Sequence, residues 1–214
     1  MRVGILGGTF DPPHIGHLIA AADAADALAL DQVLFIPTYR QPLKVDSVAA
    51  SPAQRLAMTQ LAVGDDPRLA VTAIEIDRGG LSFTVDTLSE LARRSPHDER
   101  FLLMGADVVR SFARWREPLE VMRLAELVVW QRGEELPDGV AAWLPRDPEG
   151  APPAHRVLEA RLIDISSTEV RSRVRAGQSI HGFVPDPVRA YILDMGLYRA
   201  ADEQEDGNDQ GTDQ

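Results

Sequence analysis

The sequence predicts an α/β fold in which a doubly wound parallel sheet carries helices on both faces. Short apolar runs that suit buried strands alternate along the chain with segments whose apolar residues recur at helical spacing. Glycine or proline ends the first two runs, at Gly7-Gly8 and at Pro37. Such alternation favours parallel strands joined by crossover helices, and ligands of these sheets bind beyond the carboxyl ends of the strands.

The predicted strands are six apolar runs. Each is short and nearly free of polar residues, as expected for strands covered on both faces. They lie at residues 3–6, 33–36, 69–76, 101–104, 127–130 and 162–165. Residues 133–155 are rich in Pro, Gly and acidic residues and are expected to form a surface excursion.

Helices are predicted between these strands. Apolar residues recur at helical spacing over residues 18–29. Ser51 as the N-cap and Pro52 in the first turn begin a helix over residues 52–63. Gly196 ends the last helix. The remaining helices are expected near residues 85–92, 106–112 and 167–176.

Composition indicates a cytoplasmic protein. The chain has 214 residues, of which 44% are hydrophobic, enough for one domain with a substantial core. No apolar run approaches the roughly 18 residues needed to span a membrane, and the first run is too short for a signal peptide. The absence of cysteine excludes disulfides, a thiolate nucleophile and thiolate metal sites. A membrane partner is not expected, and the oligomeric state stays open, with a homo-oligomer compatible.

Charge is concentrated at the C-terminus. The formal net charge is −11, which argues against nucleic-acid binding. Residues 199–214 are expected to be a disordered acidic tail, because the stretch 200–214 holds six acidic residues, no basic residue and no large apolar side chain. The rest of the chain carries −5, since the tail holds six of the 33 acidic residues. A phosphate site would therefore need local positive charge and backbone donors.

The turn after the first strand carries the strongest chemical signal, in the sequence GGTFDPPHIGH over residues 7–17. The glycine pair lets the backbone approach a ligand and present N–H groups to it. His14 and His17 are three residues apart at the opening of a helix, so both imidazoles can lie on one face. A helix N-terminus also favours anions. Two imidazole donors there can hold phosphate oxygens, and Gly16 between them leaves room for a ligand.

Other interpretations of this turn remain open on the residues alone. A glycine pair after a strand is a weak signal by itself. The two histidines could be metal ligands, although no third ligand is obvious nearby. The segment lacks the Gly-Lys-Ser/Thr of a phosphate-binding loop and does not match Gly-x-Gly-x-x-Gly.

A second segment, ISSTEVR over residues 165–171, follows the last predicted strand. Ser166 and Glu169 have the spacing of a capping box, so a helix begins here. Capping alone is sufficient to explain the serines.

Together the two segments resemble the signatures of the nucleotidyltransferase superfamily that includes the nicotinate-nucleotide adenylyltransferases. Gly-Gly-Thr-Phe-Asp-Pro followed by His-x-Gly-His is similar to the active-site sequence of that family, and Ile-Ser-Ser-Thr-x-x-Arg to its ATP-binding sequence. The resemblance covers roughly residues 1–198, apart from 133–155. It implies a single Rossmann-like nucleotidyltransferase domain over residues 1–198. The implied reaction transfers AMP from ATP to nicotinic acid mononucleotide, giving deamido-NAD and pyrophosphate in NAD biosynthesis.

The resemblance also implies site residues. The catalytic groups would be His14, His17 and Arg171. Mg²⁺ would be bound through the ATP phosphates and not by protein side chains. The residues implied to bind ATP are Gly7, Gly8, Thr9, Phe10, His17, Gly105, Asp107, Ile165, Ser166, Ser167 and Arg171.

The mononucleotide site is implied by three further segments. The loop PTYRQPLK suggests Lys44 for the acceptor phosphate, and SFTVDT suggests Thr84 for the nicotinate carboxylate. Asp107 is expected at a ribose and Trp115 on the pyridine ring. A solvated lysine, a helix start and a core tryptophan are the structural alternatives. Many relatives have an aromatic residue after that tryptophan, and Arg116 stands there in this chain.

Two other functions are weighed against this one. A sister transferase would act on pantetheine phosphate or transfer a cytidylyl group. Chain length, the SFTVDT segment and the Ser-Ser-Thr form count against both. A nucleotide-binding sensor would keep the fold without turnover. The intact histidine pair disfavours a sensor, because binding alone needs no donors for a transition state.

Overall fold

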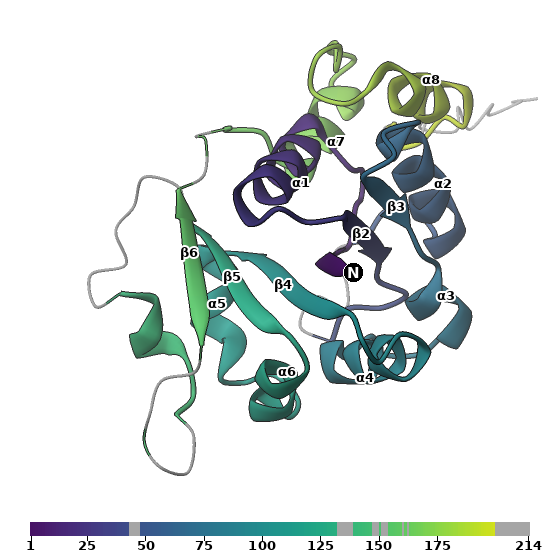
Figure 1. The fold of residues 1–214 in the computed structure, drawn as a ribbon. Helices are drawn as coiled ribbons and strands as arrows, with labels where there is room; N and C mark the ends of the chain where they lie inside the picture. Colours follow the sequence, from purple (N-terminus) through teal and green to yellow (C-terminus); the bar gives the residue numbers. More distant parts are fainter. Residues whose placement is uncertain are drawn as a thin grey trace, which may run out of the picture.

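The sheet is fully parallel and has the doubly wound order that the sequence predicts. The computed structural model describes residues 1–42, 48–131, 139–146, 150, 154–159, 161 and 163–199. Within these residues, six strands pair in the order β3-β2-β1-β4-β5-β6 (Figure 1). The strand order reverses between β1 and β4, which makes their carboxyl ends the expected ligand site. The strands are β1 (Arg2–Gly8), β2 (Gln32–Pro37), β3 (Leu69–Val71), β4 (Glu99–Gly105), β5 (Glu126–Gln131) and β6 (His155–Glu159).

Helices cover both faces of the sheet. In Figure 1, α1, α7 and α8 lie above the sheet and α4 and α6 below it. On the lower face a short 3-10 helix, η1 (Val140–Trp143), also packs into the core through buried Val140. The α-helices are α1 (Ile15–Leu28), α2 (Pro52–Val63), α3 (Ile74–Arg78), α4 (Thr84–Arg94), α5 (Ala106–Phe112), α6 (Pro118–Leu124), α7 (Ser167–Arg175) and α8 (Asp186–Asp194).

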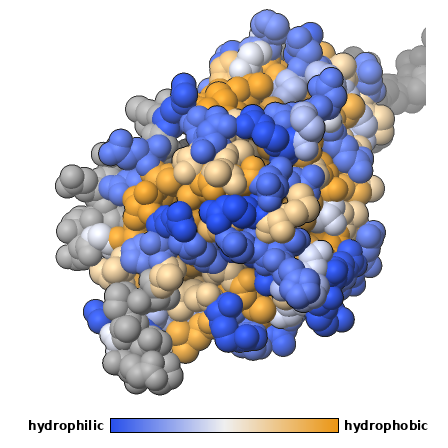
Figure 2. Space-filling view, viewed as in Figure 1, coloured by the Kyte–Doolittle hydropathy of each residue, from blue (hydrophilic) through white to orange (hydrophobic). Residues whose placement is uncertain are grey.

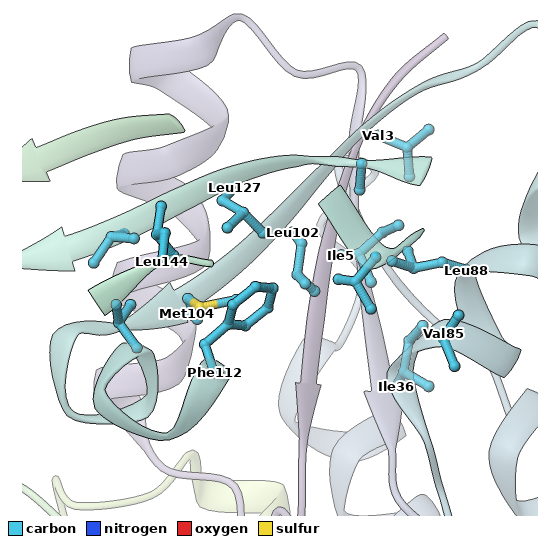
Figure 3. Close-up of a cluster of buried hydrophobic side chains, with 14 of the residues drawn as sticks. Val3, Ile5, Ile36, Val85, Leu88, Leu102, Met104, Phe112, Leu127 and Leu144 are labelled. Atoms are coloured by element: carbon cyan, nitrogen blue, oxygen red, sulfur yellow. The ribbon is translucent and has the colours of Figure 1, made fainter. Parts of the chain in front are cut away.

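Side chains alternate between the two faces of each central strand. Figure 3 shows Ile5, Leu102 and Met104 gathered with Leu88 of α4 and Phe112 of α5. The intervening strand residues instead pack against α1, whose buried face is made of alanines and lets the helix approach closely. A third cluster joins α2, α7 and α8. Packing on the two faces therefore fixes α1 and α4, whose first residues lie at the carboxyl edge of the sheet.

Local sequence signals account for two helix boundaries. Ser51 caps α2 by accepting the backbone N–H of Gln54, and Pro52 is its first residue, as predicted. After α8, Gly196 adopts a positive φ of 61°. Its N–H donates to Leu193 O, and the next N–H donates to Ile192 O at 2.9 Å. These two hydrogen bonds end the helix, and glycine favours such an ending because it adopts a positive φ without steric cost.

The structure corrects two of the predicted strands and contains elements that were not predicted. Strand β3 ends at Val71, because only its three residues pair with β2 at the edge of the sheet. Ile74–Arg78, which the prediction placed in this strand, is the helix α3. The described part of the predicted strand 162–165 is not a strand. The sixth strand is β6, an exposed edge strand inside and just beyond the predicted surface excursion, and it has too few apolar residues to be recognised. Helix α6 was not predicted.

The surface is mixed. Apolar and hydrophilic residues are interspersed over the face seen in Figure 2. Large exposed apolar side chains lie on different elements, such as Leu61 on α2, Leu119 on α6 and Val157 on β6. Among the described helices, none combines the length and apolar character needed to cross a bilayer.

The acidic segment 200–214 lies outside the described residues, and its disorder stays a prediction. We expect that truncation after Arg199 leaves the melting temperature and kcat unchanged, because the segment has no large apolar side chain that could dock. Thermal unfolding and steady-state turnover of the truncated and full-length chains check this expectation. A clear fall in either quantity would show that the segment packs or acts.

Candidate active site

A cavity of about 570 Å³ lies at the carboxyl ends of the central strands. Gly7 and Gly8 of β1, Gly105 of β4 and Trp130 of β5 contribute to its wall. The wall continues over the starts of α1 and α4. The cavity therefore lies where the strand order reverses, which is the expected position for a ligand in this fold.

The loop between β1 and α1 is built around a buried phenylalanine. Phe10 has a positive φ of 50° and is 2% exposed. A Cβ at Gly8 would lie 3.0 Å from this ring, so a side chain at this position would push the ring by a few tenths of an ångström. The ring contacts His17 edge-on at 5.1 Å between centroids and Phe35 at 5.7 Å. Phe10 supports His17 from below and is not part of the cavity wall.

The two predicted catalytic histidines are brought together. Their ring centroids are 3.8 Å apart, and His14 is the N-cap of α1. The backbone N–H of His14 donates to Nδ1 of His17 at 3.1 Å. A neutral imidazole with Nδ1 as acceptor carries its proton on Nε2, so His17 has an N–H donor there. His17 and Gly16 line the cavity, whereas His14 is buried behind them.

Helix α7 docks onto the same loop. Ser166 caps α7 by accepting the N–H of Glu169, as its spacing predicts. The hydroxyl of Ser167 donates to Pro12 O, and Nη1 of Arg171 donates to Asp11 O, both at 2.8 Å. The two distant sequence segments therefore meet, and Arg171 lies beside the histidine loop. Ser167 and Arg171 do not form the cavity wall, whereas Ile163, which was not predicted, does.

The opposite wall of the cavity contains the segment predicted for the pyridine ring. Thr84 lines the cavity and is the first residue of α4. The first N–H groups of a helix have no acceptor within it, although that of Asp86 donates to the N-cap carbonyl of Phe83 at 3.1 Å. Trp115 also lines the cavity, and its ring packs on Phe112 at 5.1 Å. Asp107 lies against Gly105, where a Cβ would be only 2.5 Å from Oδ1 of Asp107. Lys44 lies outside the described residues.

Arg116 also lines the cavity. Its guanidinium lies 5.0 Å from the ring centroid of Phe83, which also lines the cavity. Its Nη1 is 3.4 Å from Oδ2 of Asp86. The half-exposed cation is therefore held over the start of α4.

Glu75 is a wall residue that sequence reasoning missed, because it fell within a predicted strand. The side chain is 6% exposed, and its Oε1 accepts a 2.6 Å hydrogen bond from the hydroxyl of Thr87 on α4. Burial raises the pKa of this carboxyl, and the bond from Thr87 and the charge of Arg78 oppose that rise. Glu75 ties α3 to the first turns of α4.

We expect E75Q to gain stability relative to the wild type as pH rises. The folded-state pKa of Glu75 is raised above its ordinary 4.5. The stabilisation of the folded state by the protonated carboxyl is therefore fully present below that value and is lost as pH rises through the folded-state pKa. The amide does not titrate. Free energies of unfolding from denaturant titration at pH 5 and pH 8 test this. A difference between the two proteins that is the same at both pH values would contradict the prediction.

The side chains of the described residues form no evident metal site. Within the ranges that the structure describes, no group of three or more His, Cys, Asp or Glu could hold a metal ion.

The family follows from comparison with known proteins. A family model described as Cytidylyltransferase-like matches residues 5–173. A protein of Gemmatimonas aurantiaca named Probable nicotinate-nucleotide adenylyltransferase is 45% identical over 93% of this chain and 93% of its own length. The same name is given to a Herpetosiphon aurantiacus protein, 44% identical over 93% of this chain and 99% of its own. The chain belongs to the cytidylyltransferase-like family, which confirms the resemblance seen in the sequence.

Solved structures agree on the fold. The structure titled Plasmodium falciparum nicotinic acid mononucleotide adenylyltransferase complexed with NaAD matches with a TM-score of 0.75 and 15% identity. The match covers 92% of this chain and 97% of that one. A putative nicotinate-nucleotide adenylyltransferase from Vibrio parahaemolyticus matches with a TM-score of 0.64 and 18% identity, over 94% and 98% of the two chains. At such identities the likeness shows the Rossmann-like α/β fold.

Proposed function

We propose that the chain transfers AMP from ATP to nicotinic acid mononucleotide, giving deamido-NAD and pyrophosphate in NAD biosynthesis. The carrying observation is that one cavity has His17 at the start of α1 on one side and Thr84 at the start of α4, with Trp115, on the other. The names of relatives that are 43–45% identical over more than nine-tenths of the chain support this assignment.

ATP is assigned to the side of the cavity that contains His17. Backbone N–H groups of Gly7 and Gly8, together with the N-terminus of α1, suit the phosphates. His17 would add its Nε2–H, and Arg171, beside the same loop, would add a cation. Mg²⁺ would be bound through the phosphates of ATP. Gly105 and Asp107 line the cavity and are also proposed to bind ATP. Thr9, Phe10, Ile165, Ser166 and Ser167, which the resemblance implies as well, lie outside the cavity wall and are proposed only to support the ATP side.

The mononucleotide is assigned to the opposite side. Trp115 would stack on the pyridine ring, and the first N–H groups of α4 near Thr84 would bind the carboxylate. Asp107 would contact a ribose. Lys44, outside the described residues, is proposed for the acceptor phosphate.

The reaction needs positioning more than covalent chemistry. An oxygen of the acceptor phosphate attacks the α-phosphorus of ATP in line, and its new P–O bond forms as the bond to the bridging oxygen breaks. That oxygen leaves on pyrophosphate. A phosphate monoester is already a competent nucleophile, so no enzyme-bound intermediate is required. His17, on the cavity wall, would stabilise charge on the transferring group, and Mg²⁺ would neutralise the departing pyrophosphate. The resemblance implies the same role for His14 and Arg171, which lie outside the wall and would act from the adjoining loop and from α7.

Pyrophosphate release with a panel of acceptors tests the function. We expect release from MgATP with nicotinic acid mononucleotide to exceed release with pantetheine phosphate by orders of magnitude. Pyrophosphate release from CTP in place of ATP would identify a cytidylyltransferase. A protein that binds ATP but releases no pyrophosphate with any acceptor would be a sensor, and the proposal would be wrong.

A further inference from the structure

Asp11 is a buried junction between four parts of the chain. The side chain is 2% exposed and sits in the loop that leads from β1 to His14. Its Oδ2 accepts the N–H of Ala49 at 2.7 Å, and its Oδ1 accepts the N–H of Ala50 at 3.1 Å. Its backbone carbonyl accepts from Arg171 of α7. One residue thus holds the histidine loop, the segment before α2 and the start of α7.

The fourth part is the C-terminal end of the domain. The hydroxyl of Tyr198 donates to Oδ1 of Asp11 at 2.7 Å, across 187 positions of sequence. Tyr198 is 9% exposed and packs in the cluster between α2, α7 and α8. Burial and the neighbouring Asp11 raise its pKa, so the phenol stays a donor over the working pH range. The turn that ends α8 at Gly196 delivers the ring to this position.

A buried arginine strengthens the same junction. Arg55 of α2 is 1% exposed, and its guanidinium donates to three backbone carbonyls. Nη1 bonds Thr9 O at 2.7 Å, Nη2 bonds Tyr39 O at 3.0 Å, and Nε bonds Ala50 O at 3.3 Å. The loop before His14 and the segment on either side of residues 43–47 are therefore fixed to one another. In the proposed function these segments serve ATP and the acceptor phosphate.

We propose that Tyr198 is a positioning residue that acts through Asp11 on the loop carrying the two histidines and on the segment at residues 48–50. This inference rests on the proposed function for its kinetic consequence. Without the phenol hydroxyl, Oδ1 of Asp11 keeps only the longer of its two hydrogen bonds, inside a site closed to water. A loop displaced by a fraction of an ångström moves transition-state donors off their targets, and such displacements cost rate more than affinity.

The test uses Y198F, which keeps the aromatic packing and removes only the hydroxyl. We expect kcat to fall by about tenfold or more, with KM for ATP within about threefold of the wild type. The matched control is V188A on α8, because Val188 is fully buried in the same cluster and is not bonded to Asp11. V188A should lower the melting temperature without lowering kcat. A kcat for Y198F within about twofold of the wild type, or an equal loss in V188A, would overturn the proposal.

Amide hydrogen exchange gives a readout that does not depend on the reaction. The N–H groups of Ala49 and Ala50 both donate to Asp11, so they should exchange faster in Y198F. Their exchange rates should be unchanged in V188A. Unchanged exchange in Y198F would also overturn the proposal. If the wild type releases no pyrophosphate with nicotinic acid mononucleotide, the proposed function fails, and the exchange experiment alone still decides whether Tyr198 holds Asp11.

Discussion

Replacing His17 with alanine is expected to lower kcat by about a hundred- to a thousandfold while the affinity for ATP changes less. Losing one donor to a developing charge typically costs about 2.7–4 kcal/mol in the transition state. His17 is suited to that role because it lines the cavity and its Nδ1 accepts the N–H of His14, which favours the tautomer with the proton on Nε2. Steady-state kinetics with MgATP and nicotinic acid mononucleotide, together with a binding isotherm for ATP, measure both quantities.

His97 offers the matched control for this substitution. It is exposed in the turn before β4, at the amino edge of the sheet and away from the cavity. H97A should therefore leave kcat unchanged. A kcat for H17A within about tenfold of the wild type would show that His17 does not stabilise the transferring group.

Catalytic efficiency with nicotinic acid mononucleotide is expected to exceed that with the amide mononucleotide by at least about a hundredfold. The start of α4 offers backbone N–H donors and the positive end of a helix dipole, and a carboxylate only accepts hydrogen bonds. The amide would turn an NH₂ toward those donors and leave them unpaired, which costs about 1–3 kcal/mol and more when a charge-assisted bond is lost.

Two side chains of this wall contribute differently. Trp115 would stack equally on the pyridine ring of the acid and on that of the amide, so it would add affinity without distinguishing the two substrates. Arg116 lies over Phe83 at the cavity wall, but its ion pairs with Asp86 and Glu117 offset its charge, so we expect it to contribute little to the preference for the acid. The measurement is kcat/KM for both mononucleotides at saturating MgATP. Equal efficiencies, or a preference for the amide, would contradict the placement of the pyridine ring beside Thr84.

Elements with strong local signals were predictable from the sequence. Ser51 and Pro52 set the start of α2, and Gly196 the end of α8, because capping depends on residues close together in the chain. Strand β6 was not predictable, since an exposed edge strand needs no apolar run. The predicted strand 69–76 contained too many residues, because β3 stops at Val71 and helix α3 follows it.

The candidate site divides in the same way. The loop with His14 and His17 and the cap of α7 could be found as local motifs, and the structure brings them together through Ser167 and Arg171. The junction at Asp11 could not be found, because its partners are 39 and 187 positions away in the sequence. Glu75 was missed for another reason, because it fell within the predicted strand 69–76, whereas the structure places it on α3.

The most direct test of adenylyl transfer is the stoichiometry of the products. Incubation with MgATP and nicotinic acid mononucleotide should yield one deamido-NAD, identified by chromatography and mass, for each pyrophosphate released. H17A should slow both products equally. Pyrophosphate without the dinucleotide, or orthophosphate in its place, would mean that the acceptor phosphate does not attack the α-phosphorus of ATP in this cavity.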